Sequence, residues 1–257
     1  MPDEGKYLYC VINESQERNF GPIGIGDRED EVHTLCFRDL ACVISSTTMT
    51  KYVIDRQNLL AHEKVIEEIM KDYSAVLPVR FCTIATSTEE IRNLLMKRYQ
   101  ELKNLLRSMD NKVELGLKVF WQNMDNVFKE IASTHKEIKS LKEKLTGNST
   151  SLSLDEKVDL GRKAKEALEE KREAQGEETL DGLRSKCIDL RKNKIAGDNM
   201  VLNCAFLVDK AHEREFDDLT EDLSQKYTDR LKFKYVGPVA PFNFAELVIK
   251  WGQEESQ

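Results

Sequence analysis

The sequence predicts an α+β protein of two domains with ferredoxin-like βαβ elements, the second domain carrying a long charged helical hairpin. Short apolar runs typical of strands alternate with amphipathic helical patterns at both ends of the chain. The length of 257 residues suits two domains of ordinary size. Residues 129–194 are about 45% charged and contain no Phe, Trp or Tyr, unlike their flanks. We therefore expect an N-terminal α+β domain over 1–112 and a C-terminal ferredoxin-like domain over 113–257, with a helical insertion at about 123–195.

The N-terminal domain is predicted to begin with strands. Residues 6–13 are apolar and aromatic, and residues 32–37 and 40–46 form two β-rich runs separated by a two-residue turn, as in a hairpin. The Gly-rich stretch 21–26 lies between the first of these runs, 6–13, and the hairpin. Its GxxGxG spacing leads into a strand and not into a helix N-terminus, so we interpret it as a mobile surface loop; a phosphate cradle is the alternative.

Two helices and one strand complete this domain. Asp55 can cap a helix that runs to about Tyr73, and Ser87 with Glu90 forms a capping box for a helix that continues to Met109. Residues 76–85 between them read as a strand. Pro78 has no N–H group, which places that end at an edge, a bulge or a strand start. The β-ββ-α-β-α order favours a ferredoxin-like unit.

The C-terminal domain is predicted to contain strands at 113–121, 200–209 and 231–236 with an amphipathic helix at 211–227. The helical middle begins with a stripe that includes Phe128, Ile131 and Ile138. It breaks at a turn over 147–151 and resumes from about Leu154 to Lys194. This hairpin would be the first crossover of the domain. Alternating charge along it indicates a solvated face, or else a docking surface for another protein.

Charge and composition exclude several classes. The net charge of −7 disfavours bulk electrostatic attraction to nucleic acid or to an anionic membrane. No apolar run reaches the length of a membrane span, and the first residues do not resemble a signal peptide, so we expect a soluble cytoplasmic protein. The six cysteines are widely spaced and none pairs with a His at ligand spacing. We expect free, mostly buried thiols, no metal and no cofactor.

Three patterns hint at chemistry. His62 and Glu63 match half of the HExxH metal motif, but Ile66 stands where the second His is needed. Cys82 and His62 could form a nucleophile–base pair if the fold brought them together. Arg80 lies in an otherwise apolar strand, where a structural salt bridge, a partner contact or an anion site would each explain it.

Several stretches together resemble the GvpF/GvpL family of gas vesicle proteins. They are Leu59-Leu60-Ala61-His62-Glu63, the run VLPVRFCT at 76–83, VELGLKV at 113–119 and GPVAPFNF at 237–244, with the opening Tyr7-Leu8-Tyr9. The resemblance spans nearly the whole chain except 129–194. The family usually has Gly where Cys82 stands, and Trp and Pro where Val239 and Ala240 stand.

The resemblance implies a non-enzymatic accessory protein of gas vesicle formation with no cofactor. Its implied partners are the major gas vesicle shell protein, which is hydrophobic, and other gas vesicle accessory proteins, with no nucleic acid and no membrane. Its implied location is the gas vesicle in a prokaryotic cytoplasm. The edge near 78–83 and the helical hairpin are the candidate docking surfaces. Candidate partner-contact positions are His62, Glu63, Pro78, Arg80, Phe81, Thr83, Gly237, Pro238, Pro241, Phe242 and Phe244.

Two other classes remain open from the residues alone. A small-molecule sensor built on ferredoxin-like domains would need a well-formed pocket and a ligand-dependent shift in melting temperature. An enzyme that uses a thiol or haem would lose activity on Cys82→Ser or would copurify with colour.

Overall fold

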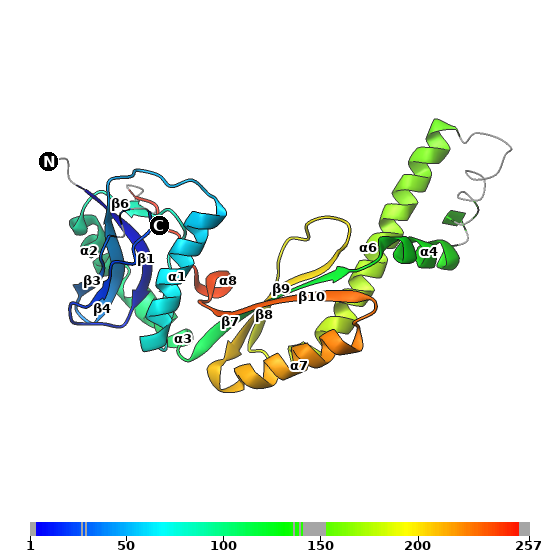
Figure 1. Ribbon diagram of the computed structural model, residues 1–257. Coiled ribbons are helices and arrows are strands. Elements are labelled where there is room, and N and C mark those ends of the chain that lie inside the picture. The colour runs from blue at the N-terminus through cyan, green and yellow to red at the C-terminus, as the bar shows by residue number, and fades with distance from the viewer. Residues whose placement is uncertain are drawn as a thin grey trace. The chain divides into compact units, whose positions relative to one another are not determined.

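The computed structural model describes residues 4–26, 28, 30–135, 137–138, 140 and 153–251, and it shows a mixed helix and sheet protein with two sheets (Figure 1). The contacts within the chain divide it into two compact units. The first contains the chain up to Glu114, Asp209–Ala211 and the residues from Gly237 onward, and the second contains Leu115–Val208 and His212–Val236. The α+β class is confirmed. The C-terminal segment thus groups with the first unit by its contacts, whereas the division at 112/113 as two folding domains stays a prediction.

The sheet of the first unit has the strand order β2-β3-β4-β1-β5, with β6 also pairing with β1. Its strands are β1 (Gly5–Ile12), β2 (Asn19–Gly21), β3 (Val32–Phe37), β4 (Leu40–Thr47), β5 (Val76–Pro78) and β6 (Ile84–Ala85). All the recorded pairings are antiparallel, and a register shift between Leu8 and Cys10 interrupts the pairing of β1 with β4. Central β1 is buried on both faces, which is why its sequence is continuously apolar and aromatic.

Helices of the first unit begin where the sequence predicts. Asp55 accepts a hydrogen bond from the Asn58 N–H and starts α1 (Arg56–Asp72), and Ser87 accepts from the Glu90 N–H and starts α2 (Thr88–Lys97). The single predicted helix to Met109 is instead two, because Arg98 leaves helical geometry before α3 (Tyr99–Ser108). Apolar side chains of α2 and α3 pack in one core cluster with the sheet, and those of α1 pack in a second cluster.

The Gly-rich stretch is not the free surface loop that we expected. Ile25 is 1% exposed, and its N–H donates to the Tyr9 hydroxyl at 2.8 Å. Gly24 donates to the Asp30 carbonyl at 2.9 Å, and a Cβ on Gly24 would lie 2.5 Å from that oxygen. The loop is therefore packed against the sheet, and Gly24 is required by this close approach.

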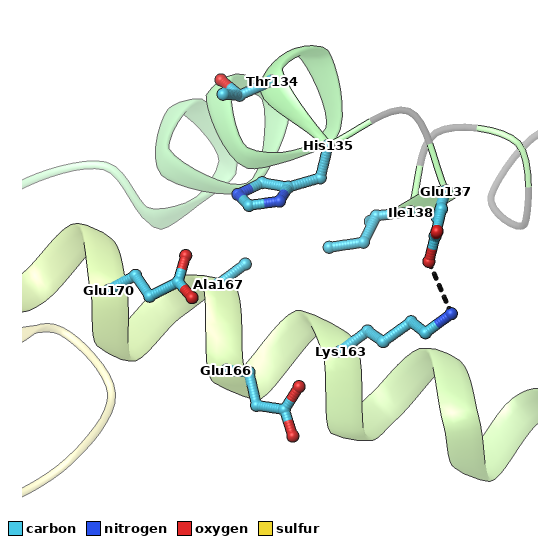
Figure 2. A pocket seen from close by; sticks show the side chains of 8 residues that line it. All are labelled: Thr134, His135, Glu137, Ile138, Lys163, Glu166, Ala167 and Glu170. Atoms are coloured by element: carbon cyan, nitrogen blue, oxygen red, sulfur yellow. Dashed lines mark hydrogen bonds and ion pairs between the residues drawn. The ribbon is translucent and has the colours of Figure 1, made fainter.

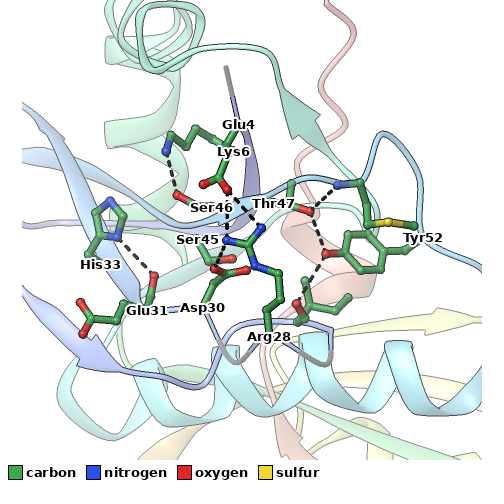
Figure 3. A network of polar contacts seen from close by, with 12 residues as sticks. Glu4, Lys6, Arg28, Asp30, Glu31, His33, Ser45, Ser46, Thr47 and Tyr52 are labelled. Atoms are coloured by element: carbon green, nitrogen blue, oxygen red, sulfur yellow. Dashed lines mark hydrogen bonds and ion pairs between the residues drawn. The ribbon is translucent and has the colours of Figure 1, made fainter. Parts of the chain in front are cut away.

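Polar contacts gather beside this loop (Figure 3). Arg28 forms ion pairs with Glu4 at 3.1 Å and Asp30 at 2.9 Å, and Lys6 donates to the Ser46 hydroxyl at 2.8 Å. Arg28 and Glu4 are both more than two-fifths exposed, so these pairs contribute little to stability.

The second unit contains the four-stranded sheet β10-β7-β9-β8. Its strands are β7 (Lys112–Trp121), β8 (Asp189–Lys192), β9 (Met200–Asp209) and β10 (Leu231–Val239), and its helices are α4 (Met124–Thr134), α6 (Leu154–Arg184) and α7 (Glu213–Lys226), with the 3₁₀ helix η1 (Lys210–His212) preceding α7. In chain order this is the βαββαβ arrangement of a ferredoxin-like unit; the ferredoxin-like character was predicted, but the three predicted strands gave a βαβαβ order. The strand β8 was missed: the helix predicted to reach Lys194 ends at Arg184, and the short, mostly charged run DLRK pairs along the edge of β9.

Burial along α6 is uneven. Its C-terminal half contributes the buried residues from Ala167 to Leu183, whereas Leu154 and Val158 in the first turns are 77% and 64% exposed. Ser153 and Glu156 form a complete capping box at the start of the helix. The predicted turn at 147–151 lies outside the described residues, so the hairpin is described as α4 and α6 alone.

Candidate functional site

Three of the motif segments identified in the sequence meet in the first unit. They are α1 with His62, the segment 78–83 after β5, and the C-terminal segment 240–247 with its short helix α8 (Phe242–Ala245). More than 150 residues separate the second from the third along the chain. We call this meeting point the motif junction.

His62 lies at the centre of the motif junction. Its side chain is buried, Nε2 lies 3.1 Å from the Val79 carbonyl oxygen, and Nδ1 lies 3.0 Å from the Tyr7 hydroxyl. A carbonyl only accepts, so Nε2 carries the proton and Nδ1 accepts from Tyr7. The Tyr7 oxygen in turn accepts the Cys82 N–H at 3.0 Å. One polar chain therefore ties both ends of the 79–82 segment to β1.

Aromatic rings surround this imidazole. Tyr9 stacks on it at 5.7 Å between centroids, and Phe81 meets it edge-on at 5.8 Å. Phe242 of the C-terminal segment is 6.4 Å away. Burial lowers the pKa of His62 to about 4, which keeps the ring neutral near pH 7.

The edge near Pro78 is not open, contrary to our expectation. Val79 pairs with Leu247 as an isolated parallel bridge, the Arg80 N–H donates to the Leu247 carbonyl at 3.0 Å, and the Leu247 N–H donates to the Pro78 carbonyl at 2.7 Å. Arg80 also pairs with Glu246 at 3.2 Å. Of the three explanations that the sequence left open for Arg80, this is the structural salt bridge. The C-terminal segment thus occupies the hydrogen-bonding groups through which a partner strand could pair.

The rest of the C-terminal motif is held by a buried acid. Glu114 accepts the backbone N–H and the side-chain amide of Asn243 at 2.7 and 2.5 Å. The Pro241 carbonyl accepts from the Phe244 and Ala245 N–H groups, which forms the single turn of α8. These contacts hold Phe242 against the core cluster of the first unit.

Other motif residues have local roles. Gly237 takes a positive φ of 135° before the cis bond to Pro238, which is exposed. Thr83 is buried and donates to the Arg80 carbonyl at 2.6 Å. Glu63 is half-buried on α1, and burial together with Glu67 raises the pKa of its carboxyl. The partner-contact role of these positions stays a prediction.

The junction lacks the contact that thiol catalysis requires. Both ring nitrogens of His62 are engaged elsewhere, and the Tyr7 hydroxyl lies between the imidazole and the Cys82 backbone. The Cys82 sulfur accepts the Tyr52 N–H at 3.1 Å. Cys82 also has a φ of 64°, a left-handed geometry that favours glycine. Within the described part of the chain, no three His, Cys, Asp or Glu side chains gather to hold a metal.

A cavity of about 470 Å³ with a mixed polar and apolar lining lies between the end of α4 and α6 (Figure 2). His135 and Ile138 face it from one side, and Ala167 and Glu170 of α6 from the other. Lys163 and Glu137 form an ion pair at 2.6 Å beside it. Its lining combines the apolar side chains of Ile138 and Ala167 with two carboxylates and an ion pair, so it differs from the mainly apolar pockets that small-molecule ligands usually occupy.

Exposed apolar side chains occur close together in the sequence, in a stretch that the sequence analysis did not single out. In the connection from β4 to α1, Met49, Val53 and Ile54 are 51%, 70% and 76% exposed, and Leu60 on α1 is 51% exposed. We call these four residues the connection patch. The sequence does contain an apolar run directly before the capping Asp55. The sequence analysis treated this run as part of the loop before the helix and assigned it no role. Of the helices that the structure describes, none has the length and apolar character to cross a bilayer.

Comparison with known proteins gives a consistent result. The family described as "Gas vesicle synthesis protein GvpL/GvpF" matches residues 5–246. The chain is 28% identical to gas vesicle protein F of Dolichospermum flosaquae, covering 94% of this chain and 97% of that protein. It is 26% identical to gas vesicle protein F of Microcystis aeruginosa, covering 95% and 99%.

Solved structures show the same fold. The crystal structure of GvpF from Anabaena sp. PCC7120 superimposes with a TM-score of 0.81 at 23% identity, covering 96% of this chain and all of that one. GvpF from Microcystis aeruginosa gives a TM-score of 0.79 at 24% identity, covering 95% and 99%. With the family match across nearly its whole length, the chain belongs to the GvpL/GvpF family of gas vesicle synthesis proteins.

Proposed function

We propose that this protein is an accessory factor of gas vesicle formation that acts by binding and not by catalysis. It binds the hydrophobic shell protein, and other accessory proteins, to support nucleation or assembly at the gas vesicle in a prokaryotic cytoplasm. Family membership supports the process. The single structural observation that supports the binding role is the connection patch, because an apolar partner needs exposed apolar surface to dock on.

The hairpin is the second candidate surface. Leu154 and Val158 lie one helical turn apart on α6, and both are well exposed beyond the part of the helix that packs on the sheet. We call this pair the hairpin stripe. Leu247 occupies the sheet edge at Val79, so that edge is not a docking surface for the shell protein. The connection patch and the hairpin stripe are the two candidate docking surfaces.

Coexpression with the major shell protein, followed by pull-down, tests the proposal. The variants are Val53→Ser with Ile54→Ser for the connection patch, and Leu154→Ser with Val158→Ser for the hairpin stripe. Ile188→Ser is the matched control, because Ile188 is also 54% exposed but belongs to neither surface. These side chains are already largely in water, so the changes cost the fold little.

The wild type and Ile188→Ser are expected to retain the shell protein, and one of the two double variants is expected to lose it. The double variant that loses binding identifies the docking surface. If the wild type retains no shell protein at micromolar concentration, the proposed binding role is wrong.

A further inference from the structure

Neither α6 nor α7 packs on one of the two faces of the sheet in the second unit (Figure 1). Both α6 and α7 lie on the opposite face: the Phe216 ring of α7 is 5.0 Å from Phe206, and Gly176 of α6 lies against Leu202. Successive side chains of a strand point to opposite faces, so the odd-numbered residues of β9 lie on the face away from α6 and α7. Val201, Ala205 and Leu207 are buried there, and the exposed part of this face is formed by β7 and β10.

The register of β7 and β10 can be read from two contacts. A Cβ built on Gly116 would lie 3.9 Å from the Cβ of Val236, so these two residues are opposite each other on one face. The Gln122 N–H donates to the Arg230 carbonyl at 3.0 Å, which matches the same antiparallel register six residues further along each strand.

This register places two lysines side by side. Lys118 lies opposite Lys234, and Phe120 lies opposite Lys232, all on the same face as Gly116. The Lys234 ammonium lies 5.2 Å from the centroid of the Phe120 ring, which confirms that the two share a face. All three lysines are exposed.

The third strand adds to the same charge. Arg191 of β8 pairs with Ala205 of β9, a neighbour of Phe206 that points away from the helices. Two acids lie on the same face: Asp189 at the far end of β8, and Glu114 of β7, which accepts hydrogen bonds from Asn243. We define the basic sheet face as Lys118, Lys232 and Lys234 with Phe120 and Val236.

Several basic residues elsewhere in this unit are paired. Lys192 on the helix side contacts Glu177, and Lys171 on α6 pairs with Glu130 at 2.6 Å. By contrast, none of the three lysines of the basic sheet face forms an ion pair or hydrogen bond with any residue that the structure describes. Like charges opposite each other destabilise a sheet, so the arrangement costs the isolated fold free energy.

We propose that the basic sheet face docks an acidic amphipathic segment of a partner protein. Carboxylates of that segment pair with the lysine ammonium groups, and its apolar side chains cover Phe120 and Val236, which is 59% exposed. Charge complementarity is the argument: three unpaired cations surround an apolar centre on a chain whose net charge is −7. The proposal is independent of the shell-binding surfaces.

A nucleic acid fits this surface less well. Ferredoxin-like sheets that bind RNA stack two or three bases on aromatic rings, and the basic sheet face offers the single ring of Phe120. The acidic remainder of the chain also repels a polyanion that extends beyond three lysines.

Fluorescence anisotropy with the full-length protein tests the docking. The probe is a labelled synthetic amphipathic helical peptide of Glu and Leu, and its match carries Gln in place of every Glu. The expected result is binding of the Glu peptide alone, weakening as NaCl rises from about 50 to about 300 mM. Lys118→Glu with Lys234→Glu is expected to weaken binding about ten-fold or more.

The matched control is Lys157→Glu with Lys165→Glu, which changes the net charge equally on the exposed side of α6 and is expected to leave affinity within about two-fold. Gly116→Thr separates docking from folding. A Cβ at that position meets Val236 only at ordinary distance, so melting is expected to be unchanged while the added side chain weakens peptide binding.

Three results would overturn the proposal. The first is equal loss of binding in the two charge-reversed variants, and the second is equal binding of the Gln peptide. The third is tighter binding of a single-stranded oligonucleotide than of the Glu peptide, which would assign the face to nucleic acid.

Discussion

Acidification is expected to destabilise the first unit through His62. The folded protein holds this imidazole neutral, with a pKa of about 4 against an ordinary value of 6.5, because burial disfavours its charged form. Below pH 6.5 the unfolded chain takes up a proton that the folded chain does not. Stability is therefore complete above pH 6.5, falls as the pH drops toward 4, and levels off below that.

The magnitude follows from the shift. Each pH unit in this window is worth about 1.4 kcal/mol, so His62 removes about 2 kcal/mol between pH 7.5 and pH 5. That is a large share of the roughly 5–15 kcal/mol by which a domain is stable. Carboxylates with lowered pKa values, such as Glu101 beside Arg98, add their own losses at lower pH, so pH 5 is the useful limit.

Urea denaturation at pH 7.5, 6.5, 5.5 and 5.0 measures the effect in the wild type, in His62→Gln and in His212→Gln. The Gln side chain can still donate to the Val79 carbonyl and accept from Tyr7, but it does not titrate. His62→Gln is expected to be less stable at pH 7.5 because it loses the stack on Tyr9, and to have a shallower pH dependence by about 2 kcal/mol over the range. The exposed control His212→Gln is expected to keep the wild-type profile.

The reasoning is refuted if His62→Gln and the wild type lose stability in parallel between pH 6.5 and 5. An NMR titration gives a second reading. An imidazole Cε1–H signal of His62 that titrates near 6 or above would show that burial does not hold the ring neutral.

Three further predictions concern the backbone and the junction. Cys82→Gly is expected to raise the free energy of unfolding by about 0.5–1 kcal/mol and Cys82→Val to lower it, since a left-handed residue favours glycine; the order Val above Gly in urea midpoints would contradict this. Gly24→Ala is expected to cost about 1–3 kcal/mol because its Cβ would lie 2.5 Å from a backbone oxygen, whereas Gly161→Ala, in open space on α6, should gain about 0.5–1 kcal/mol, both read from thermal melting. Leu247→Ala is expected to cost about 2–4 kcal/mol because Leu247 is 2% exposed in the core, against less than about 0.5 kcal/mol for the exposed neighbour Val248→Ala; equal values would mean that the C-terminal segment is not bound as described.

Local signals predicted the elements whose cause is local. Asp55 and Ser87 cap helices because their side-chain oxygens accept a hydrogen bond from the backbone N–H three residues later. This contact is local and does not depend on where the helix packs in the fold. The strand β8 escaped prediction because its four residues lack apolar alternation and owe their conformation to pairing with β9. The Gly-rich stretch was assigned to the open surface because its composition is that of a turn, whereas the Tyr9 hydroxyl and the Asp30 carbonyl hold it on the sheet.

The candidate site also has features that the sequence predicted and features that it did not. The order and spacing of the motifs identified His62, Arg80 and Phe242 as family-motif positions. They did not indicate that the three residues lie close together, because the sequence between 83 and 237 does not define the distance between its two ends in the folded protein. The filled edge at Val79 and the exposed connection patch depend on which surface another segment covers.

By itself the sequence determined the α+β class, the strands and helices with strong periodicity or caps, and the family, because these depend on residues close together in the chain or on the order of motifs along it. Only the tertiary structure decided that the C-terminal segment closes the β5 edge, that Tyr7 separates Cys82 from His62, and that three lysines share the sheet face away from α6 and α7. Each of these is a contact or a burial between segments far apart in sequence, and its free energy exists only once the chain has folded.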